Sequence, residues 1–194
     1  MTLVARLTAA LALAAPEGLR EGDLAEGSSD DAREAAVLVA VTDRPEPGVL
    51  FTVRHEDLRT HAGQVSFPGG QVDPDDRDPA HTALREAWEE ISLDPAQVKL
   101  CGTADRYRTI SNYCITPVIG VIPPDLDFTL DPGEVSELFE VPLAFLLDTD
   151  NHRHDSVEFK GRIRGFTEMR WQGYRIWGAT AAMIVNLSRR LQCR

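Results

Sequence analysis

The chain contains only three cysteines in 194 residues, Cys101, Cys114 and Cys193. An odd and sparse set suits a reducing compartment better than a disulfide framework. Neither a Cys-x-x-Cys pair nor a Cys/His spacing typical of zinc sites is present. We therefore expect a cytoplasmic protein without structural disulfides.

Positive charge is also scarce, because 20 Lys and Arg stand against 31 Asp and Glu and give a formal net charge of −11 at pH 7. Nucleic acids and anionic membrane surfaces are bound through an excess of Lys and Arg, so neither is expected as a partner. An anionic small molecule would need local basic residues. The candidates are Arg54, Arg59, Arg106 and Arg108.

No apolar run is long enough to span a bilayer. Residues 1–15, MTLVARLTAALALAA, carry Ala12-Leu13-Ala14, which resembles a signal-peptide cleavage site, but Arg6 lies inside the apolar part. We favour an amphipathic helix that docks on the domain or on a second copy of it, which would give a homodimer. Its apolar residues at helical spacing are Leu3, Leu7, Leu11 and Ala14.

The rest of the sequence predicts one globular domain. With 43% hydrophobic residues, a chain of this length can bury a core. We expect an N-terminal helix and linker over 1–34 and a single domain over 35–194. Apolar and β-branched runs predict strands at 35–42, 49–54, 98–103, 114–122 and 134–143, a short edge strand at 128–130, a hairpin within 151–164 and a helix at 181–191. Because strands and helices alternate, the fold class is α/β.

The most informative stretch runs from Phe67 to Leu93 and reads FPGGQVDPDDRDPAHTALREAWEEISL. A helix should begin near Asp78, Pro79 or Thr82, since Asp and Thr are good N-caps and Pro suits a first helical position. Its apolar residues share one face, which we expect to be buried, and its glutamates project from the other face. The apolar face holds Leu84, Ala87, Trp88 and Ile91, and the acidic face holds Glu86, Glu89 and Glu90.

Two interpretations of the acidic face are open. Glu86 and Glu90 lie one turn apart, where like charges destabilise a helix by about 0.2–0.5 kcal/mol. The face can be solvated, with Arg85 pairing to Glu89 four residues on. It can also bind a hard cation, because carboxylate oxygens suit Mg²⁺ or Mn²⁺. The glycine pair just upstream favours the cation site, since adjacent glycines let the backbone lie close to the helix start.

This stretch resembles the signature of the Nudix hydrolases, which cleave nucleoside diphosphates linked to another group. The matching residues are Gly70, Asp76, Arg85, Glu86, Ala87, Glu89, Glu90 and Leu93. The usual pattern is Gly, five residues, Glu, seven residues, then Arg-Glu-aliphatic-x-Glu-Glu-x-Gly-aliphatic. This chain differs from the pattern in three places. Asp76 replaces the first Glu, eight residues instead of seven separate it from Arg85, and Ser92 replaces the Gly. The Ser92 difference affects only the helix end, where a non-Gly residue tolerates a left-handed cap less well.

The resemblance implies an α/β/α sandwich with a mixed sheet over about residues 35–190. It also implies metal-dependent hydrolysis of a pyrophosphate bond, with Mg²⁺ or Mn²⁺ held by Glu86, Glu89 and Glu90. Arg85 is expected to orient these glutamates rather than to touch substrate.

The segment 134–143 is similar to one that passes close to the metal site in Nudix proteins. Glu134 and Glu137 are therefore candidates for a further ligand or for the base that deprotonates the attacking water. The alternative is that both are solvated acids at a strand edge.

A second motif, at 50–54 and 58–70, is similar to the additional signature of the coenzyme A pyrophosphatase branch, which hydrolyses coenzyme A to 3′,5′-ADP and 4′-phosphopantetheine. Guanidinium groups bind phosphate in a bidentate way, so Arg54 and Arg59 are candidates for the pyrophosphate or the 3′-phosphate. His61 either donates a hydrogen bond to substrate or orders the loop. The full set of implied substrate-binding residues is Arg54, Arg59, His61, Gln64, Gly69 and Gly70.

Two other functions remain open. One is a Nudix pyrophosphatase for ADP-ribose or a dinucleotide, because the glutamate helix determines the chemistry and not the leaving groups. The other is a non-catalytic module that binds a nucleotide. His152 and His154 are not expected to bind metal, since partner cysteines are missing. Trp177 is interpreted as packing rather than as a stacking platform for adenine.

Overall fold

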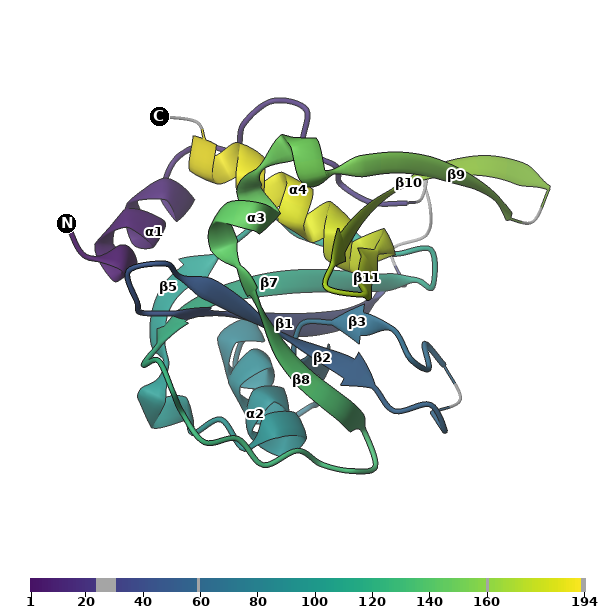
Figure 1. Ribbon diagram of the computed structural model, residues 1–194. Coiled ribbons are helices and arrows are strands. Elements are labelled where there is room, and N and C mark those ends of the chain that lie inside the picture. The colour runs from purple at the N-terminus through teal and green to yellow at the C-terminus, as the bar shows by residue number, and fades with distance from the viewer. Residues whose placement is uncertain (24–30, 59, 160, 193–194) are drawn as a thin grey trace.

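The computed structural model describes residues 1–23, 31–58, 60–159 and 161–192 (Figure 1). The helices are α1 (Leu3–Leu11), α2 (Pro79–Ile91), α3 (Leu143–Leu147) and α4 (Gly178–Gln192), with 3-10 turns at Pro95–Gln97 and Thr149–Asn151. The strands are β1 (Arg33–Thr42), β2 (Gly48–Arg54), β3 (Val65–Ser66), β4 (Gly69–Gln71), β5 (Lys99–Thr103), β6 (Tyr107–Arg108), β7 (Tyr113–Ile122), β8 (Val135–Pro142), β9 (Arg153–Phe159), β10 (Arg162–Trp171) and β11 (Tyr174–Trp177).

The main sheet is centred on β1, whose residues from 35 to 42 are all buried. β1 and β2, the strands predicted at 35–42 and 49–54, form an antiparallel hairpin, and β1 pairs in parallel with β7 along its whole length. Among the described residues the strand order is β3-β2-β1-β7-β5, with β8 added to β2, β4 to β1 and β6 to β7. The sheet is mixed, because it contains one parallel pair among antiparallel pairs. β1 is buried on both faces, which explains the continuous apolar run in its sequence.

Helices cover both faces of this sheet. α2 lies on one face over a smaller core, and α1, α3 and α4 lie on the other over a larger core (Figure 1). The α/β/α arrangement predicted from the resemblance is therefore confirmed. Leu7 of α1 is 4% exposed, and α1 packs against β5 and α4, so the N-terminal helix docks on its own domain.

The hairpin predicted within 151–164 is present as β9 and β10, which extends to Trp171. With β11 these strands form a second, three-stranded sheet. One end of the hairpin projects beyond the main sheet, as Figure 1 shows. The aromatic ring of Tyr174 on β11 stacks on Phe139 of β8 at 3.7 Å between centroids, which ties the small sheet to the large one.

The buried face of α2 differs from the prediction. Trp88 was expected to be buried but is 52% exposed, and Glu90 was expected to be exposed but is 2% exposed. Ala87 and Ile91 are buried as predicted, and Ala83 packs on the sheet with them. Alanines allow the helix backbone to approach the sheet closely, so this stripe, which includes position 90, is buried in place of the one with the larger side chains.

The short strand predicted at 128–130 is wrong, because the structure has irregular backbone there. Phe128 and Leu130 pack against the core under α2 as single side chains, which explains the apolar pattern without a strand. Part of the predicted linker, residues 24–30, lies outside the described residues. In the described part of the chain, no helix has both the length and the apolar character needed to cross a membrane.

Candidate active site

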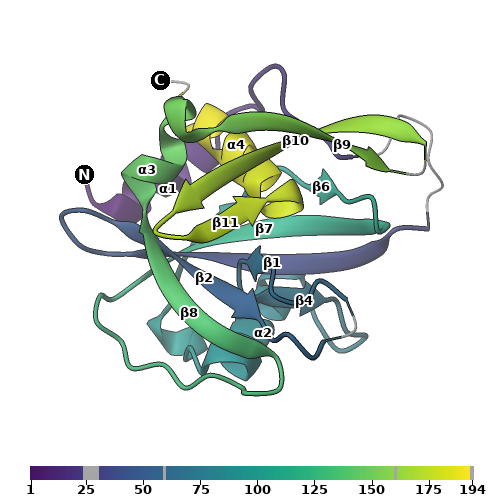
Figure 2. The same ribbon diagram turned by 45° about the vertical axis from the view of Figure 1, so that its right-hand side comes forward.

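The candidate site is built where β4 meets α2. Asp78 caps the helix, accepting a hydrogen bond from the backbone N–H of His81 at 2.8 Å, and Pro79 is the first helical residue, as predicted. β4 pairs with β1 and lies close to α2 (Figure 2). The acidic helix is thus anchored beside the glycine pair.

The two glycines are required by close contacts. Gly69 has φ of +153°, and a Cβ there would lie 2.4 Å from the carbonyl oxygen of Ala36. A Cβ on Gly70 would lie 2.5 Å from the carboxyl group of Glu86. Glycine at position 69 therefore lets the chain pass close to the backbone of β1, and glycine at position 70 leaves room for the carboxyl group of Glu86.

Glu90 is the buried acid of the site. Its Oε2 accepts a hydrogen bond from the backbone N–H of Gly69 at 3.3 Å, and its Oε1 lies 3.9 Å from Nη1 of Arg54. Burial raises the pKa of Glu90 to about 8, and the nearby carboxylates of Glu86 and Glu134 act in the same direction. Such a buried acid is typical of a functional site.

Arg85 holds the other two glutamates. Its Nη1 donates to Glu86 at 2.8 Å and to Glu89 at 3.0 Å. Glu86 is half-buried, and burial raises its pKa despite the adjacent guanidinium, whereas the Glu89 side chain is 52% exposed. The orienting contact predicted for Arg85 is present in the structure.

Asp76, the residue that departs from the signature, is the main partner of Arg85. Its side chain is 1% exposed and accepts from Nε of Arg85 at 3.1 Å and from Nη2 at 2.9 Å. His81 Nδ1 lies 2.7 Å from Asp76 Oδ1, and the Thr82 hydroxyl donates to Oδ2 at 2.9 Å. These contacts hold the pKa of Asp76 well below its usual range, with the Arg85 hydrogen bonds as the largest cause. No role in the site was predicted for Asp76, although its position in the signature was the signal.

This lowered pKa predicts acid sensitivity. A carboxyl whose pKa is lowered by folding contributes stability that is present above its unfolded pKa, about 3.9 for Asp, and is lost as the pH falls toward the folded value. We expect thermal melts of Asp76→Asn to show a smaller loss of Tm than the wild type between about pH 4 and about pH 2. Parallel pH dependence in the two proteins would contradict a stabilising Asp76 carboxylate.

The donor set fits a hard divalent cation. Besides burial, the carboxylate of Glu134 raises the pKa of both Glu86 and Glu90, and that of Glu86 raises the pKa of Glu90, so a cation among them would relieve repulsion. Within the described residues, no three Asp, Glu, His or Cys side chains already converge as ligands, and Glu86 and Glu89 are instead turned to Arg85. Carboxylate oxygens beside the backbone N–H of Gly69 are a suitable environment for Mg²⁺ or Mn²⁺ with a phosphate.

The candidate substrate loop connects β2 to β3. Arg54 is anchored to it, because its N–H donates to the Gln64 carbonyl at 3.0 Å and its carbonyl accepts from the N–H of Gly63 at 3.0 Å. His61 has φ of +59°, and its Nδ1 lies 2.9 Å from the side-chain oxygen of Gln64. In the described part of the chain, the buried Nε of Arg54 has no hydrogen-bond partner. Arg59 lies outside the described residues.

The two later acids lie in different places. Glu134 is exposed just before β8 and close enough to affect the pKa values of Glu86 and Glu90. Glu137 pairs in register with Val53 on the face of the sheet opposite α2, and its carboxylate accepts a hydrogen bond from the Tyr174 hydroxyl. The structure brings Glu134 to the α2 glutamates and leaves Glu137 apart from them.

The other candidate arginines also have partners elsewhere. Arg106 forms an ion pair with Glu34, and Nη2 of Arg108 donates to Asn112 at 2.9 Å. Neither contact involves the glutamates of α2, so Arg54 is the described candidate arginine nearest to them.

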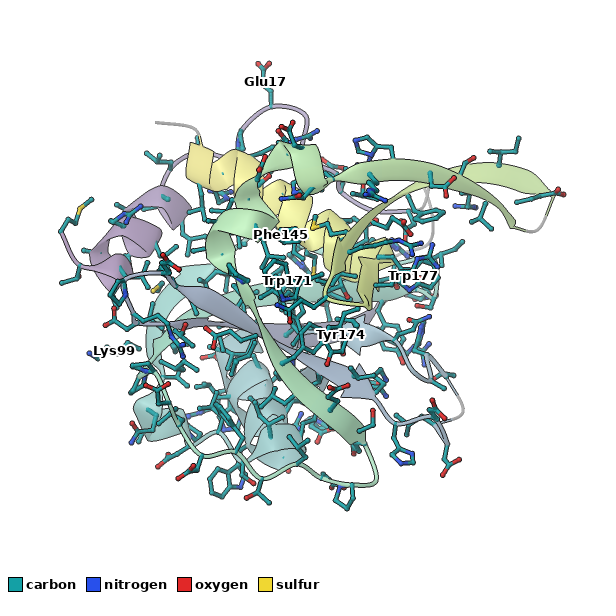
Figure 3. All side chains as sticks on the ribbon, in the orientation of Figure 1. Glu17, Lys99, Phe145, Trp171, Tyr174 and Trp177 are labelled. Carbon is teal, nitrogen blue, oxygen red and sulfur yellow. The ribbon has the colours of Figure 1, made fainter. Side chains whose placement is uncertain are left out.

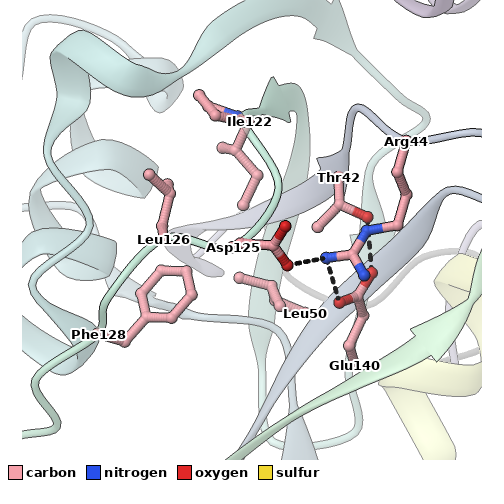
Figure 4. A pocket seen from close by; sticks show the side chains of 9 residues that line it. Thr42, Arg44, Leu50, Ile122, Asp125, Leu126, Phe128 and Glu140 are labelled. Carbon is pink, nitrogen blue, oxygen red and sulfur yellow. Dashed lines mark hydrogen bonds and ion pairs between the residues drawn. The ribbon is translucent and has the colours of Figure 1, made fainter.

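A hollow of about 250 Å³ lies farther along β1, beyond the glutamates (Figure 4). Arg44 pairs there with Glu140 at 3.2 Å and with Asp125 at 3.6 Å. Leu50, Leu126 and Phe128 supply apolar walls. The hollow contains none of the candidate site residues.

Comparisons with known proteins identify the family of the chain. A family model for the NUDIX domain matches residues 32–159. The chain is 42% identical over 161 residues to the "Uncharacterized Nudix hydrolase NudL" of Cronobacter sakazakii. The aligned region covers 83% of this chain and 84% of that protein. The chain is 40% identical over 156 residues to the protein of the same name from Escherichia coli strain K12, covering 80% and 81%.

Solved structures give the same fold. A MutT/nudix family protein from Enterococcus faecalis superposes with a TM-score of 0.52 at 11% identity, over 84% of this chain and 63% of that one. The Nudix hydrolase RenU from M. smegmatis gives 0.50 at 22% identity, over 59% and 73%. Because the family model covers most of the chain and the curated relatives match it at about 40% identity, the chain belongs to the Nudix hydrolase family.

Proposed function

We propose that this Nudix hydrolase cleaves the pyrophosphate bond of coenzyme A and its derivatives, giving 3′,5′-ADP and 4′-phosphopantetheine. The observation that carries the proposal is the anchoring of the second motif. Its loop is hydrogen-bonded to the end of β2 through Arg54, and Arg54 also faces the buried carboxylate of Glu90. The motif that resembles the coenzyme A branch therefore lies directly beside the acidic helix.

Each part of the site has a role in this reaction. Arg54 would bind a phosphate of the substrate, because its guanidinium lies beside Glu90 and its side chain is 26% exposed. Gly69 and Gly70 would let the diphosphate approach the backbone. Glu134 would take the proton of the attacking water, since it is exposed yet close to Glu86 and Glu90.

Glu86, Glu89 and Glu90 would hold Mg²⁺ or Mn²⁺. Bound divalent cations supply neutralisation of the phosphate charge and a lower pKa for a coordinated water. Arg85 acts on the reaction only through Glu86 and Glu89, whose carboxylates it holds.

A side-by-side assay tests this function. The purified protein is incubated with coenzyme A, ADP-ribose and NADH, first in Mg²⁺ and then in Mn²⁺, and the products are separated by chromatography. We expect 3′,5′-ADP from coenzyme A at a rate at least about tenfold above that of the other substrates, because the second motif lies at the site. Omission of the metal, with a chelator present, should abolish the reaction.

Two results would replace the proposal. Cleavage of ADP-ribose or NADH without cleavage of coenzyme A would keep the pyrophosphatase chemistry and assign another substrate. Tight nucleotide binding without turnover in either metal would indicate a binding module. The intact set of Glu86, Glu89 and Glu90 argues against the latter.

A further inference from the structure

The outer face of the three-stranded sheet carries aromatic and cationic side chains that the site described above does not use. Glu168 is opposite Trp177 in the register of β10 and β11, and Arg170 is opposite Arg175. Side chains alternate along a strand, so these four residues and Phe166 share one face, while the opposite face is buried in the larger core. The sequence favours packing for Trp177, but the structure leaves it only half-buried.

Arg175 lies beside both aromatic rings of this face, which also contact each other edge to face. Its guanidinium carbon is 4.9 Å from the ring centroid of Trp177 and 5.6 Å from that of Phe166. Its Nε donates to Glu168 at 2.6 Å, and Nε of Arg170 donates to the other oxygen of Glu168 at 3.0 Å. Two guanidinium groups share one carboxylate, which leaves a positive charge, and the Arg175 side chain is 44% exposed.

This face lies next to the candidate substrate loop. β11 lies against β3, and the Thr180 hydroxyl, three residues after Trp177, donates to the carbonyl of Val65 at 3.2 Å. Val65 directly follows Gln64, whose carbonyl accepts from the N–H of Arg54. Figure 3 shows Trp177 at the end of β11, near β3. Contacts therefore link Glu90 to Arg54, Arg54 to the loop, and the end of the loop to Thr180 just after β11.

The chemistry of the face matches one end of the proposed substrate. The adenosine part of coenzyme A carries a planar base and a 3′-phosphate monoester beyond the scissile diphosphate. Guanidinium groups bind phosphate monoesters through charge-assisted hydrogen bonds, and indole rings stack on bases. We propose that Arg175 binds the 3′-phosphate of the substrate and that Trp177 contacts its adenine. This assignment rests on the proposed function and names the part of the substrate that determines specificity.

Comparison of coenzyme A with dephospho-coenzyme A, which lacks only the 3′-phosphate, tests the assignment. We expect the kcat/KM of the wild type for coenzyme A to be about tenfold to hundredfold higher than its kcat/KM for dephospho-coenzyme A. This is the range that one or two charge-assisted hydrogen bonds supply. Arg175→Ala should bring the two values together by raising KM for coenzyme A, with kcat retained because the glutamates are untouched.

Arg170→Ala is the matched control. It removes the same charge and the same kind of contact with Glu168 from the position directly opposite Arg175, whereas the contacts with the rings of Trp177 and Phe166 described above are made by Arg175. The control should keep the preference for coenzyme A. Titration with 3′,5′-ADP and 5′-AMP gives a readout without turnover, in which Arg175→Ala should weaken binding of 3′,5′-ADP alone by about tenfold or more.

Three outcomes would overturn the assignment. Equal kcat/KM values for the two substrates in the wild type would do so while leaving coenzyme A hydrolysis in place. An unchanged preference in a folded Arg175→Ala, checked by its thermal melt, would do the same. Cleavage of ADP-ribose without cleavage of coenzyme A would contradict the proposed function. In that case, equal affinity of the wild type for 3′,5′-ADP and 5′-AMP would also contradict a 3′-phosphate site at Arg175.

Discussion

Glu90→Gln is expected to lower kcat by about a thousandfold or more while leaving the protein folded. Loss of a carboxylate ligand removes several kcal/mol of stabilisation from the transition state, and about 4 kcal/mol corresponds to this factor. Glutamine has nearly the same shape and remains able to accept the hydrogen bond from Gly69. The measurement is kcat at saturating Mn²⁺ together with a thermal melt.

The direction of the stability change follows from the pKa. The pKa of Glu90 is raised to about 8, so between about 4.5 and about 8 the metal-free folded state holds a proton that the unfolded state releases. Stability therefore falls as the pH rises through this window, and a neutral Gln at position 90 does not have this cost. Without metal, the Tm of Glu90→Gln relative to the wild type should increase from about pH 5 to about pH 8.

Glu89→Gln is the control for Glu90→Gln, because it makes the same substitution at an exposed position of the same helix. Its side chain is 52% exposed and pairs with Arg85, so we expect a smaller loss of kcat and no pH-dependent gain in Tm. Wild-type kcat in Glu90→Gln would leave Glu90 as a buried acid without a catalytic role. A fall in Tm at pH 8 would contradict the raised pKa.

The sequence predicted the fold class and most elements because their signals are local. The continuous apolar run at 35–42 becomes β1, and the Asp78-Pro79 pair begins α2. The buried face of α2 could not be predicted fully from the sequence. Helical spacing alone does not say which of two overlapping rows of side chains packs against the sheet. Packing against the sheet selects Ala83 and Ala87 and so buries Glu90.

The site was predicted in part for a similar reason. The signature includes the glutamates and Arg85, and the contacts of Arg85 with Glu86 and Glu89 lie within one helix. Residues brought together by distant segments had no comparable signal. Glu137 looked equivalent to Glu134 in the sequence, yet strand alternation places it on the other face of the sheet, beside Tyr174. The end of β11 lies near the loop only because β11 packs against β3 and Thr180 bonds to the carbonyl of Val65, which is 115 residues away in the sequence.

Arg85→Ala is expected to have the largest effect on stability, a loss of about 3 kcal/mol or more. Removing one partner of a buried ion pair leaves an uncompensated charge, which costs about 3–5 kcal/mol. Asp76, at 1% exposure, would keep only its contacts with His81, Thr82 and the N–H of Asp73. The free energy of unfolding from urea titration measures this change.

Arg77→Ala is the matched control, since it removes the same charge from an exposed position near the start of the helix. We expect it to change stability by less than about 0.5 kcal/mol. Arg85→Lys should recover part of the stability, because it restores the charge but not the bidentate contact with Asp76.

The double variant Arg85→Ala/Asp76→Asn separates the contribution of the ion pair from that of the helix. If Arg85 acts mainly by compensating Asp76, the double variant should be more stable than Arg85→Ala alone, because the buried charge is gone. Its kcat should nevertheless stay low, since Glu86 and Glu89 would still lack the guanidinium that holds them. A double variant with recovered stability and wild-type kcat would show that Arg85 stabilises the fold without positioning the glutamates.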